Sequence, residues 1–259
     1  MRVCRSTRTG VVMAVMDEFR EEREALKHGT FRQKFSYFWL YYKWHVIGGL
    51  AAVVFLGTFA HGVMTGKDDA FYGAFPNAWE LEERSGEFLQ GFAAFRGIDT
   101  GEYNVSIDSS LHIVADSMDE TSIAATQKLM VYIAAGELDV LASDAAIFRQ
   151  YAYNDVFADL RTLLTLEQME QLGPYFYYVD RAVVEQLNEA VVLEEADLPA
   201  YPDPSKPEDM AEPVPVGVFV DSCRKLQEAY VFAEGGAIGI LVNTKRPGEA
   251  VGFLEYLFE

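Results

Sequence analysis

Cysteine and histidine are scarce in this chain of 259 residues, which contains two cysteines and four histidines. Two thiols cannot form a disulfide framework, so the fold must rely on a hydrophobic core. We expect Cys223 to be a small buried residue within that core. His112 is the only histidine after residue 65, which leaves few candidates for a general base or a zinc ligand.

The common catalytic signatures are also missing. The chain has no HExxH, GxSxG, P-loop or CxxC motif, and no calcium-binding loop with its central glycine. We interpret His112, in the strand-like run SSLHIV, as a structural residue rather than a base. Asp119 and Glu120 are interpreted as charges at a helix start. The sequence therefore predicts no enzyme, no metal site and no cofactor.

Positive charge is scarce after residue 43. Residues 1–43 carry nine cations and five anions, whereas the remainder carries twelve cations and thirty-five anions, a net charge of −23. Such an acidic domain repels a phosphate backbone, so nucleic acid is excluded as a partner. We interpret the acidity mainly as a source of solubility.

An uncharged run of 19 residues, VIGGLAAVVFLGTFAHGVM at 46–64, follows an aromatic-rich segment. At 1.5 Å per residue this length spans a bilayer core of about 30 Å. Its strongly apolar residues favour insertion by about 3 to 5 kcal/mol. Together with Trp44 and His45, the run predicts a transmembrane helix at 44–64.

The charges that flank this helix predict its orientation. Lys67 is followed at once by two aspartates, whereas four cations precede the helix closely: Lys27, Arg32, Lys34 and Lys43. We therefore expect a cytoplasmic segment at 1–43, an uncleaved signal anchor, a linker at 65–70 and an extracellular domain at 71–259. Met16, which opens a helix-like segment, is a candidate for the true start of the chain.

The extracellular part alternates between strand-like and helix-like patterns, which is typical of an α/β fold with a mainly parallel or mixed sheet. We expect strands at 71–75, 103–107, 138–142, 216–220 and 237–242, with a further candidate at 175–180. We expect helices at 78–95, 118–135, 144–152, 165–172, 222–230 and 247–258. The proline-rich, acidic stretch at 194–215 is interpreted as an exposed excursion between two of these elements.

Two runs resemble type 2 extracellular solute-binding proteins. The run GELDVLASDAAIFRQYAYNDVFADLRTLL (136–164) leads from a helix into a strand, another helix and a turn, as in that family. The run AIGILVNTKRPGEAVGFLEYLF (237–258) is similar to the family's strand, polar turn and proline-started helix. The run REEREALKHGTFRQKFSYFW-x-YYKWH (20–45) resembles that of uncharacterised membrane-anchored bacterial proteins that carry such a domain. The resemblance implies part of a periplasmic-binding-protein type 2 fold, reduced or single-lobed because about 195 residues are few for two lobes.

Candidate ligand residues follow two of the expected strands at their carboxyl ends, where helix N-termini offer unpaired N–H groups. Ser143 and Asp144 follow the strand at 138–142, and Asn243 and Thr244 follow the last strand. The alternatives are N-capping for the first pair and turn chemistry before Pro247 for the second.

The sequence thus favours a membrane-tethered extracellular binding or accessory domain that resembles a solute-binding protein. Its expected partners are the membrane and either a small-molecule solute or an envelope protein, such as a component of a transporter. The alternative is a structural or protein–protein interaction protein whose α/β domain has lost ligand binding.

Overall fold

The computed structural model describes residues 44–45, 47–58, 66–115, 119–189, 199–232 and 235–259. The chain divides into two units, residues 1–66 and residues 67–259. In the first unit, residues 44–45 and 47–58 are helical and exposed. Among the described residues, no helix combines the length and the apolar character that crossing a bilayer requires. The remainder of the expected span, at 46 and 59–64, and the segment at 1–43 lie outside the described residues.

The second unit is built on one mixed six-stranded sheet, which confirms the α/β fold class. Its strands are β1 (Asp68–Ala74), β3 (Tyr103–Asp108), β4 (Val140–Ser143), β5 (Phe176–Asp180), β6 (Pro213–Phe219) and β8 (Ala237–Ile240). They lie in the order β3-β1-β4-β8-β6-β5. The pairs β3–β1 and β1–β4 are parallel, whereas β4–β8, β8–β6 and β6–β5 are antiparallel.

These directions give the sheet two distinct edges. At the carboxyl edge, β1, β3, β4 and β6 end while β5 and β8 begin. At the amino edge, β1, β3, β4 and β6 begin while β5 and β8 end. The register supports this assignment, because Ser143 at the end of β4 pairs with Ala237 at the start of β8.

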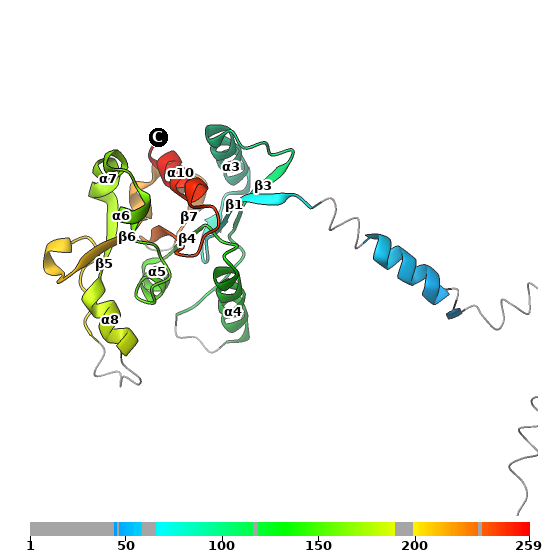
Figure 1. The fold of residues 1–259 in the computed structure, drawn as a ribbon, viewed down its shortest axis with the longest axis horizontal. Coiled ribbons are helices and arrows are strands. Elements are labelled where there is room, and N and C mark those ends of the chain that lie inside the picture. Colours follow the sequence, from blue (N-terminus) through cyan, green and yellow to red (C-terminus); the bar gives the residue numbers. More distant parts are fainter. Residues whose placement is uncertain (1–43, 46, 59–65, 116–118, 190–198, 233–234) are drawn as a thin grey trace, which may run out of the picture. The chain divides into compact units, whose positions relative to one another are not determined.

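Helices cover both faces of the sheet, giving three layers (Figure 1). One face packs against α3 (Glu82–Arg96), α9 (Arg224–Gln227) and α10 (Pro247–Phe258), with α6 (Leu160–Leu163) and α7 (Leu166–Leu172). The other face packs against α4 (Glu120–Ala135), α5 (Ala145–Ala152) and α8 (Arg181–Glu189). A two-stranded sheet of β2 (Trp79–Glu80) and β7 (Tyr230–Val231) completes the unit.

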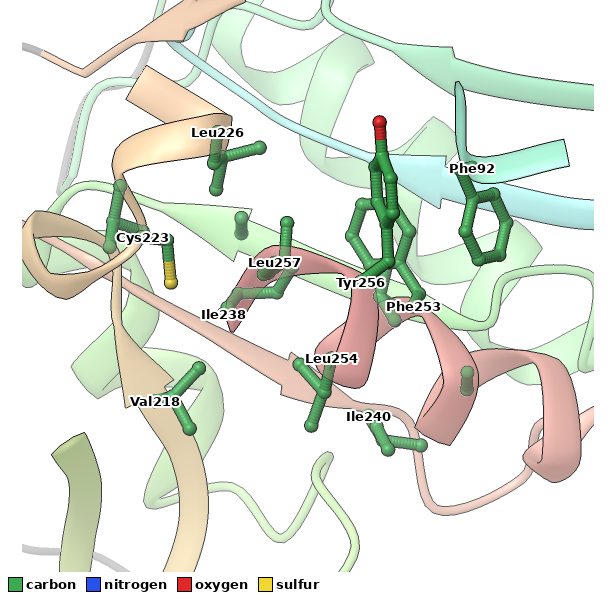
Figure 2. Packing of buried hydrophobic residues seen from close by; sticks show 14 of the residues in the cluster. Phe92, Val218, Cys223, Leu226, Ile238, Ile240, Phe253, Leu254, Tyr256 and Leu257 are labelled. Atoms are coloured by element: carbon green, nitrogen blue, oxygen red, sulfur yellow. The ribbon is translucent and has the colours of Figure 1, made fainter. Parts of the chain in front are cut away.

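The core on the α3 and α10 face is rich in aromatic rings. The ring of Phe71 in β1 lies with its centroid 4.8 Å from that of Phe92 and 4.6 Å from that of Phe253. Figure 2 shows Phe253 and Tyr256 of α10 beside Phe92 of α3. Each such pair contributes about 0.5 to 1.5 kcal/mol beyond the area it buries. Cys223 is fully buried in this cluster, as the sequence predicted.

Local sequence signals explain the ends of α4. The side chain of Asp119 accepts hydrogen bonds from the backbone N–H groups of Thr121 and Ser122, which confirms its interpretation as a helix-start charge. Gly136 ends the helix with a φ of 64°, a conformation that suits glycine. A Cβ at this position would also lie 2.7 Å from the carbonyl oxygen of Asn243.

Several expectations were wrong in detail. The run SSLHIV forms a loop in which His112 is exposed, not a strand. The helix expected at 222–230 is a 3-10 turn (Val220–Ser222) followed by the short α9. Helix α8 was not anticipated at all, because its nine residues follow the expected strand at 175–180 without a separating turn signal.

The proline-rich stretch also differs in part. Residues 194–198 lie outside the described residues, and residues 199–212 are irregular apart from a 3-10 turn at Pro207–Asp209. However, β6 begins at Pro213, inside the expected excursion. Proline fits there because Pro213 and Pro215 pair only with β5, whereas β8 pairs with β6 at Val218 and Phe219.

Candidate functional site

Ser143 and Asp144 lie at the carboxyl edge, where β4 leads into α5. Ser143 is fully buried, and its Oγ has no hydrogen-bond partner among the described residues. Oδ1 of Asp144 accepts hydrogen bonds of 3.1 Å from the N–H groups of Ala146 and Ile147. Asp144 therefore acts as the N-cap of α5, which was the alternative interpretation of this residue.

Asn77 is a second polar residue at the carboxyl edge, and no sequence motif marks it. Its Nδ2 donates to Oδ2 of Asp144 at 2.9 Å and to the carbonyl oxygen of Ile113 at 2.6 Å. Its Oδ1 accepts from the N–H of Ile113 at 2.9 Å. Asn77 has a φ of 62°, which asparagine tolerates better than most residues. The side chain thus joins the end of β1, the loop after β3 and the start of α5.

Asn243 and Thr244 lie at the amino edge. Nδ2 of Asn243 donates to the carbonyl oxygen of Ile133, near the C-terminus of α4. Oγ1 of Thr244 donates to Oδ1 of Asp139 at 2.5 Å and accepts from the N–H of Arg246 at 3.0 Å. Both side chains are engaged in turn and helix-end contacts.

A buried ion pair completes the amino edge. The side chain of Asp139 is fully buried, and its Oδ2 accepts from Nε of Arg246 and from the N–H of Tyr72, both at 2.9 Å. Arg246 also donates to the carbonyl oxygens of Asp69 at 3.0 Å and Glu137 at 2.6 Å. Burial raises the pKa of Asp139, and its hydrogen bonds act in the opposite direction. The network ties β1 and β4 to the segment before α10.

The structure therefore separates the two candidate pairs. Because β8 runs antiparallel to β4, its carboxyl end lies at the amino edge, about 13 Å from Ser143 for a strand of this length. The four side chains do not line one common site. A ligand-binding role for Ser143, Asp144, Asn243 and Thr244 stays a prediction.

A cavity of about 290 Å³ lies beside α5 and includes residues of the carboxyl edge. Its lining combines aromatic rings, prolines, one arginine and one aspartate; the residues are Ala145, Arg149, Tyr177, Tyr201, Pro202, Asp203, Pro204, Phe219 and Gly235. The volume is close to the lower end of ligand sites, about 300 Å³. An apolar lining with few polar groups is typical of small-molecule sites.

Aromatic contacts hold the walls of this cavity. The ring centroids of Tyr177 and Phe219 are 5.3 Å apart, and those of Tyr153 and Tyr201 are 4.6 Å apart. The guanidinium carbon of Arg149 lies 5.4 Å from the centroid of Tyr201, a cation–π contact. Burial raises the pKa of Tyr177, whose phenol therefore stays protonated near neutral pH.

The backbone of β5 holds the wall at 201–204, and Asp180 at the end of β5 anchors residues 211–212 farther along the same stretch. The N–H of Tyr178 donates to the carbonyl oxygen of Pro204 at 3.0 Å. The buried carboxylate of Asp180 accepts from the N–H groups of Ala182, Ala211 and Glu212 at 2.8–3.1 Å. Burial alone would raise the pKa of Asp180, but these three donors outweigh it and hold the pKa below its ordinary value.

The residues of the cavity come from parts of the chain that local patterns do not connect. Arg149 falls within an expected helix, whereas Tyr201 falls within the stretch interpreted as an exposed excursion. The sequence signal for this cavity is the motif YPDP at 201–204. Its two prolines indicate a rigid turn, and its tyrosine supplies an aromatic side chain. That signal does not identify what the turn packs against.

Within the described residues, no group of three or more His, Cys, Asp or Glu side chains is arranged to hold a metal ion. Comparisons with protein-family models, with curated proteins and with solved structures each returned no match to this chain.

Proposed function

We propose that this chain is a membrane-tethered extracellular binding domain, anchored by the helix expected at 44–64. In this proposal residues 67–259 are a single-lobed relative of the type 2 solute-binding proteins. The domain binds a small molecule in the cavity between α5 and residues 201–204. The compact unit at 67–259, with its one six-stranded sheet, fits the single-lobed form.

The observation that carries this proposal is the cavity itself. It has about 290 Å³ of volume, several aromatic walls and one cationic side chain, Arg149. The wall at 201–204 is fixed to β5 by the backbone hydrogen bond from the N–H of Tyr178 to the carbonyl oxygen of Pro204. A preformed cavity of this kind binds a ligand without a large cost of ordering its walls.

A thermal-shift screen tests ligand binding. Full-length protein in detergent micelles is screened against amino acids, short peptides, sugars and small organic acids and bases. We expect at least one class to raise the melting temperature of the wild type, and we expect Tyr201→Ala to lose that shift. Tyr175→Ala is the matched control, because Tyr175 is similarly exposed at 38% but stacks on Phe258 outside this cavity. If no compound shifts the wild type, the ligand-binding role is excluded.

Protease treatment of intact cells tests the topology. Protease added outside the cells is expected to remove residues 67–259 while the cytoplasmic segment at 1–43 stays protected. Full protection of the domain, or recovery of the protein in the cytosolic fraction, would contradict the proposed location.

An interaction protein is the second candidate, and one exposed pair favours it. Trp79 in β2 is 73% exposed and pairs with Val231 in β7, which is 47% exposed. Exposed tryptophan is enriched where proteins bind each other. Crosslinking in native membranes discriminates between the candidates, because a reproducible protein partner without any small-molecule shift supports the second one.

A further inference from the structure

Arg149 differs from most cations of the domain in having no carboxylate partner among the described residues. Nine of the twelve lysines and arginines after residue 43 form ion pairs within the described chain. In a domain with thirty-five anions, a cation without such a pair is unusual. Arg149 is exposed, and the contact its side chain makes is with the ring of Tyr201.

Among the described residues that line the cavity, the one anion is engaged elsewhere. The carboxylate of Asp203 accepts from the N–H of Ser205 at 3.0 Å and from its Oγ at 2.7 Å. It also lies 3.3 Å from Nζ of Lys206. Asp203 therefore stabilises its own turn, and the guanidinium of Arg149 is left as the available charge of the cavity.

From this arrangement we infer that the cavity binds a small monocarboxylate with a flat aromatic body. The inference rests on the proposed binding function and names its ligand class. A guanidinium presents two parallel N–H groups that match a carboxylate, and this geometry is stronger and more specific than a single neutral hydrogen bond. The rings of Tyr177, Tyr201 and Phe219 supply apolar walls for the body of the ligand.

Charge decides between a carboxylate and a phosphate ester. The described residues of the lining offer one cation, and the surrounding domain has a net charge of −23. A phosphate monoester carries close to two negative charges at neutral pH, so one guanidinium would leave much of that charge uncompensated in a repulsive field. A monocarboxylate is neutralised by Arg149 alone.

Volume sets the size of the ligand. At about 30 Å³ per water molecule, a cavity of about 290 Å³ holds roughly ten waters. A ring with a short carboxylate side chain, such as phenylacetate, has about that many non-hydrogen atoms.

The test compares matched probes on the full-length protein in detergent micelles by isothermal titration calorimetry. The probes are phenylacetate, its neutral isostere phenylacetamide, the ringless anion acetate, and phenyltrimethylammonium. We expect phenylacetate to bind about tenfold to a hundredfold more tightly than phenylacetamide, because that ratio corresponds to one charge-assisted hydrogen-bonded contact. Acetate is expected to bind more weakly than both.

Variants locate the contact. Arg149→Gln is expected to abolish the preference for phenylacetate over phenylacetamide, and Arg149→Lys is expected to restore part of it. Arg224→Gln is the matched control, because Arg224 is an arginine with a side chain that is 93% exposed and lies outside this cavity. Near-UV circular dichroism of each variant verifies that the domain is folded.

The outcomes separate this inference from the proposed function. If phenylacetamide or phenyltrimethylammonium binds as tightly as phenylacetate, and Tyr201→Ala removes that binding, the ligand class is wrong while the cavity is a binding site. If none of the probes binds, the inference is overturned. The proposed function is overturned as well only when the broader thermal-shift screen also finds no ligand.

Discussion

The two edges of the six-stranded sheet carry polar groups in different states of pairing. At the amino edge, the buried carboxylates of Asp139 and Asp180 each accept three hydrogen bonds. At the carboxyl edge, Ser143 is buried without a partner among the described residues, and Ala145, Phe219 and Gly235 border a cavity. Paired groups at the amino edge stabilise the fold, while the carboxyl edge borders the cavity, whose lining includes Arg149 without a carboxylate partner among the described residues.

The difference predicts where substitutions cost stability and where they cost binding. Substitutions at the amino edge should destabilise the domain, because they leave buried polar groups without a partner. Substitutions around the cavity should leave the fold largely intact and change what it binds. Four experiments test this division, from the largest expected effect on stability to the smallest.

Arg246→Ala is expected to have the largest effect. It leaves the fully buried carboxylate of Asp139 without its cation, which costs about 3 to 5 kcal/mol of unfolding free energy. Urea denaturation of the full-length protein, followed by near-UV circular dichroism, measures this loss. Lys245→Ala is the matched control, because its pair with Glu137 is exposed and should contribute less than about 1 kcal/mol.

The pH dependence of Arg246→Ala sharpens the same experiment. Without the guanidinium, burial raises the pKa of Asp139 further, so its proton is held in the folded state. A raised pKa in the folded state stabilises at low pH, and that stabilisation is lost as the pH rises through the folded value. Arg246→Ala should therefore lose less unfolding free energy, relative to the wild type, near pH 4 than at pH 7. An equal loss at the two pH values would contradict this role of Asp139.

Asp180→Asn is expected to cost about 2 kcal/mol at neutral pH, because an amide cannot accept from all three backbone donors as a carboxylate does. The pKa of Asp180 is held below its ordinary value, so its stabilisation is present above about pH 4 and is lost as the pH falls through the folded value. Acid denaturation of wild type and variant measures this term. The stability of the variant should therefore fall less than that of the wild type as the pH is lowered. Identical dependence of unfolding free energy on pH in the two proteins would contradict this role of Asp180.

Tyr201→Ala is expected to cost only about 1 kcal/mol of unfolding free energy, because the ring is 40% exposed and the variant loses mainly its tilted ring contact with Tyr153. The effect of Tyr201→Ala on ligand binding should be far larger than its effect on stability, since the variant lacks one wall of the cavity and the cation–π contact of Arg149. Parallel measurements of stability and of the thermal shift separate the two effects. If Tyr201→Ala destabilised the domain as much as Arg246→Ala, the division between the edges would fail.

Much of the sheet was predictable, because its strands are short apolar runs bounded by turn residues. The expected strands at 71–75, 103–107, 138–142, 216–220 and 237–242 each overlap an observed strand. Strand direction was not predictable from these patterns. The last strand is antiparallel to its neighbours, and this direction moved Asn243 and Thr244 to the amino edge, away from Ser143.

The cavity could not be predicted for a different reason. The N-cap role of Asp144 is predictable, since a cap is a local motif of a few residues. Arg149 and Tyr201 are 52 positions apart in the sequence and meet only because residues 199–212 fold back on β5. Local composition described that stretch as exposed, whereas the hydrogen bonds of Asp180 and Tyr178 fix it to the domain.

Trp79→Ser should have the smallest effect on stability, within about 0.5 kcal/mol, because the ring is 73% exposed. It follows β1 and so lies beside the carboxyl edge, which makes it a test of whether that edge contacts a protein rather than a solute. If the interaction role is correct, crosslinking in native membranes should recover less partner with Trp79→Ser than with wild type. Leu166→Ser is the control, because Leu166 is an apolar residue that is 86% exposed on α7, outside the two-stranded sheet of β2 and β7. Equal recovery with Trp79→Ser and Leu166→Ser would remove the Trp79 pair from consideration and leave the cavity as the functional feature of this edge.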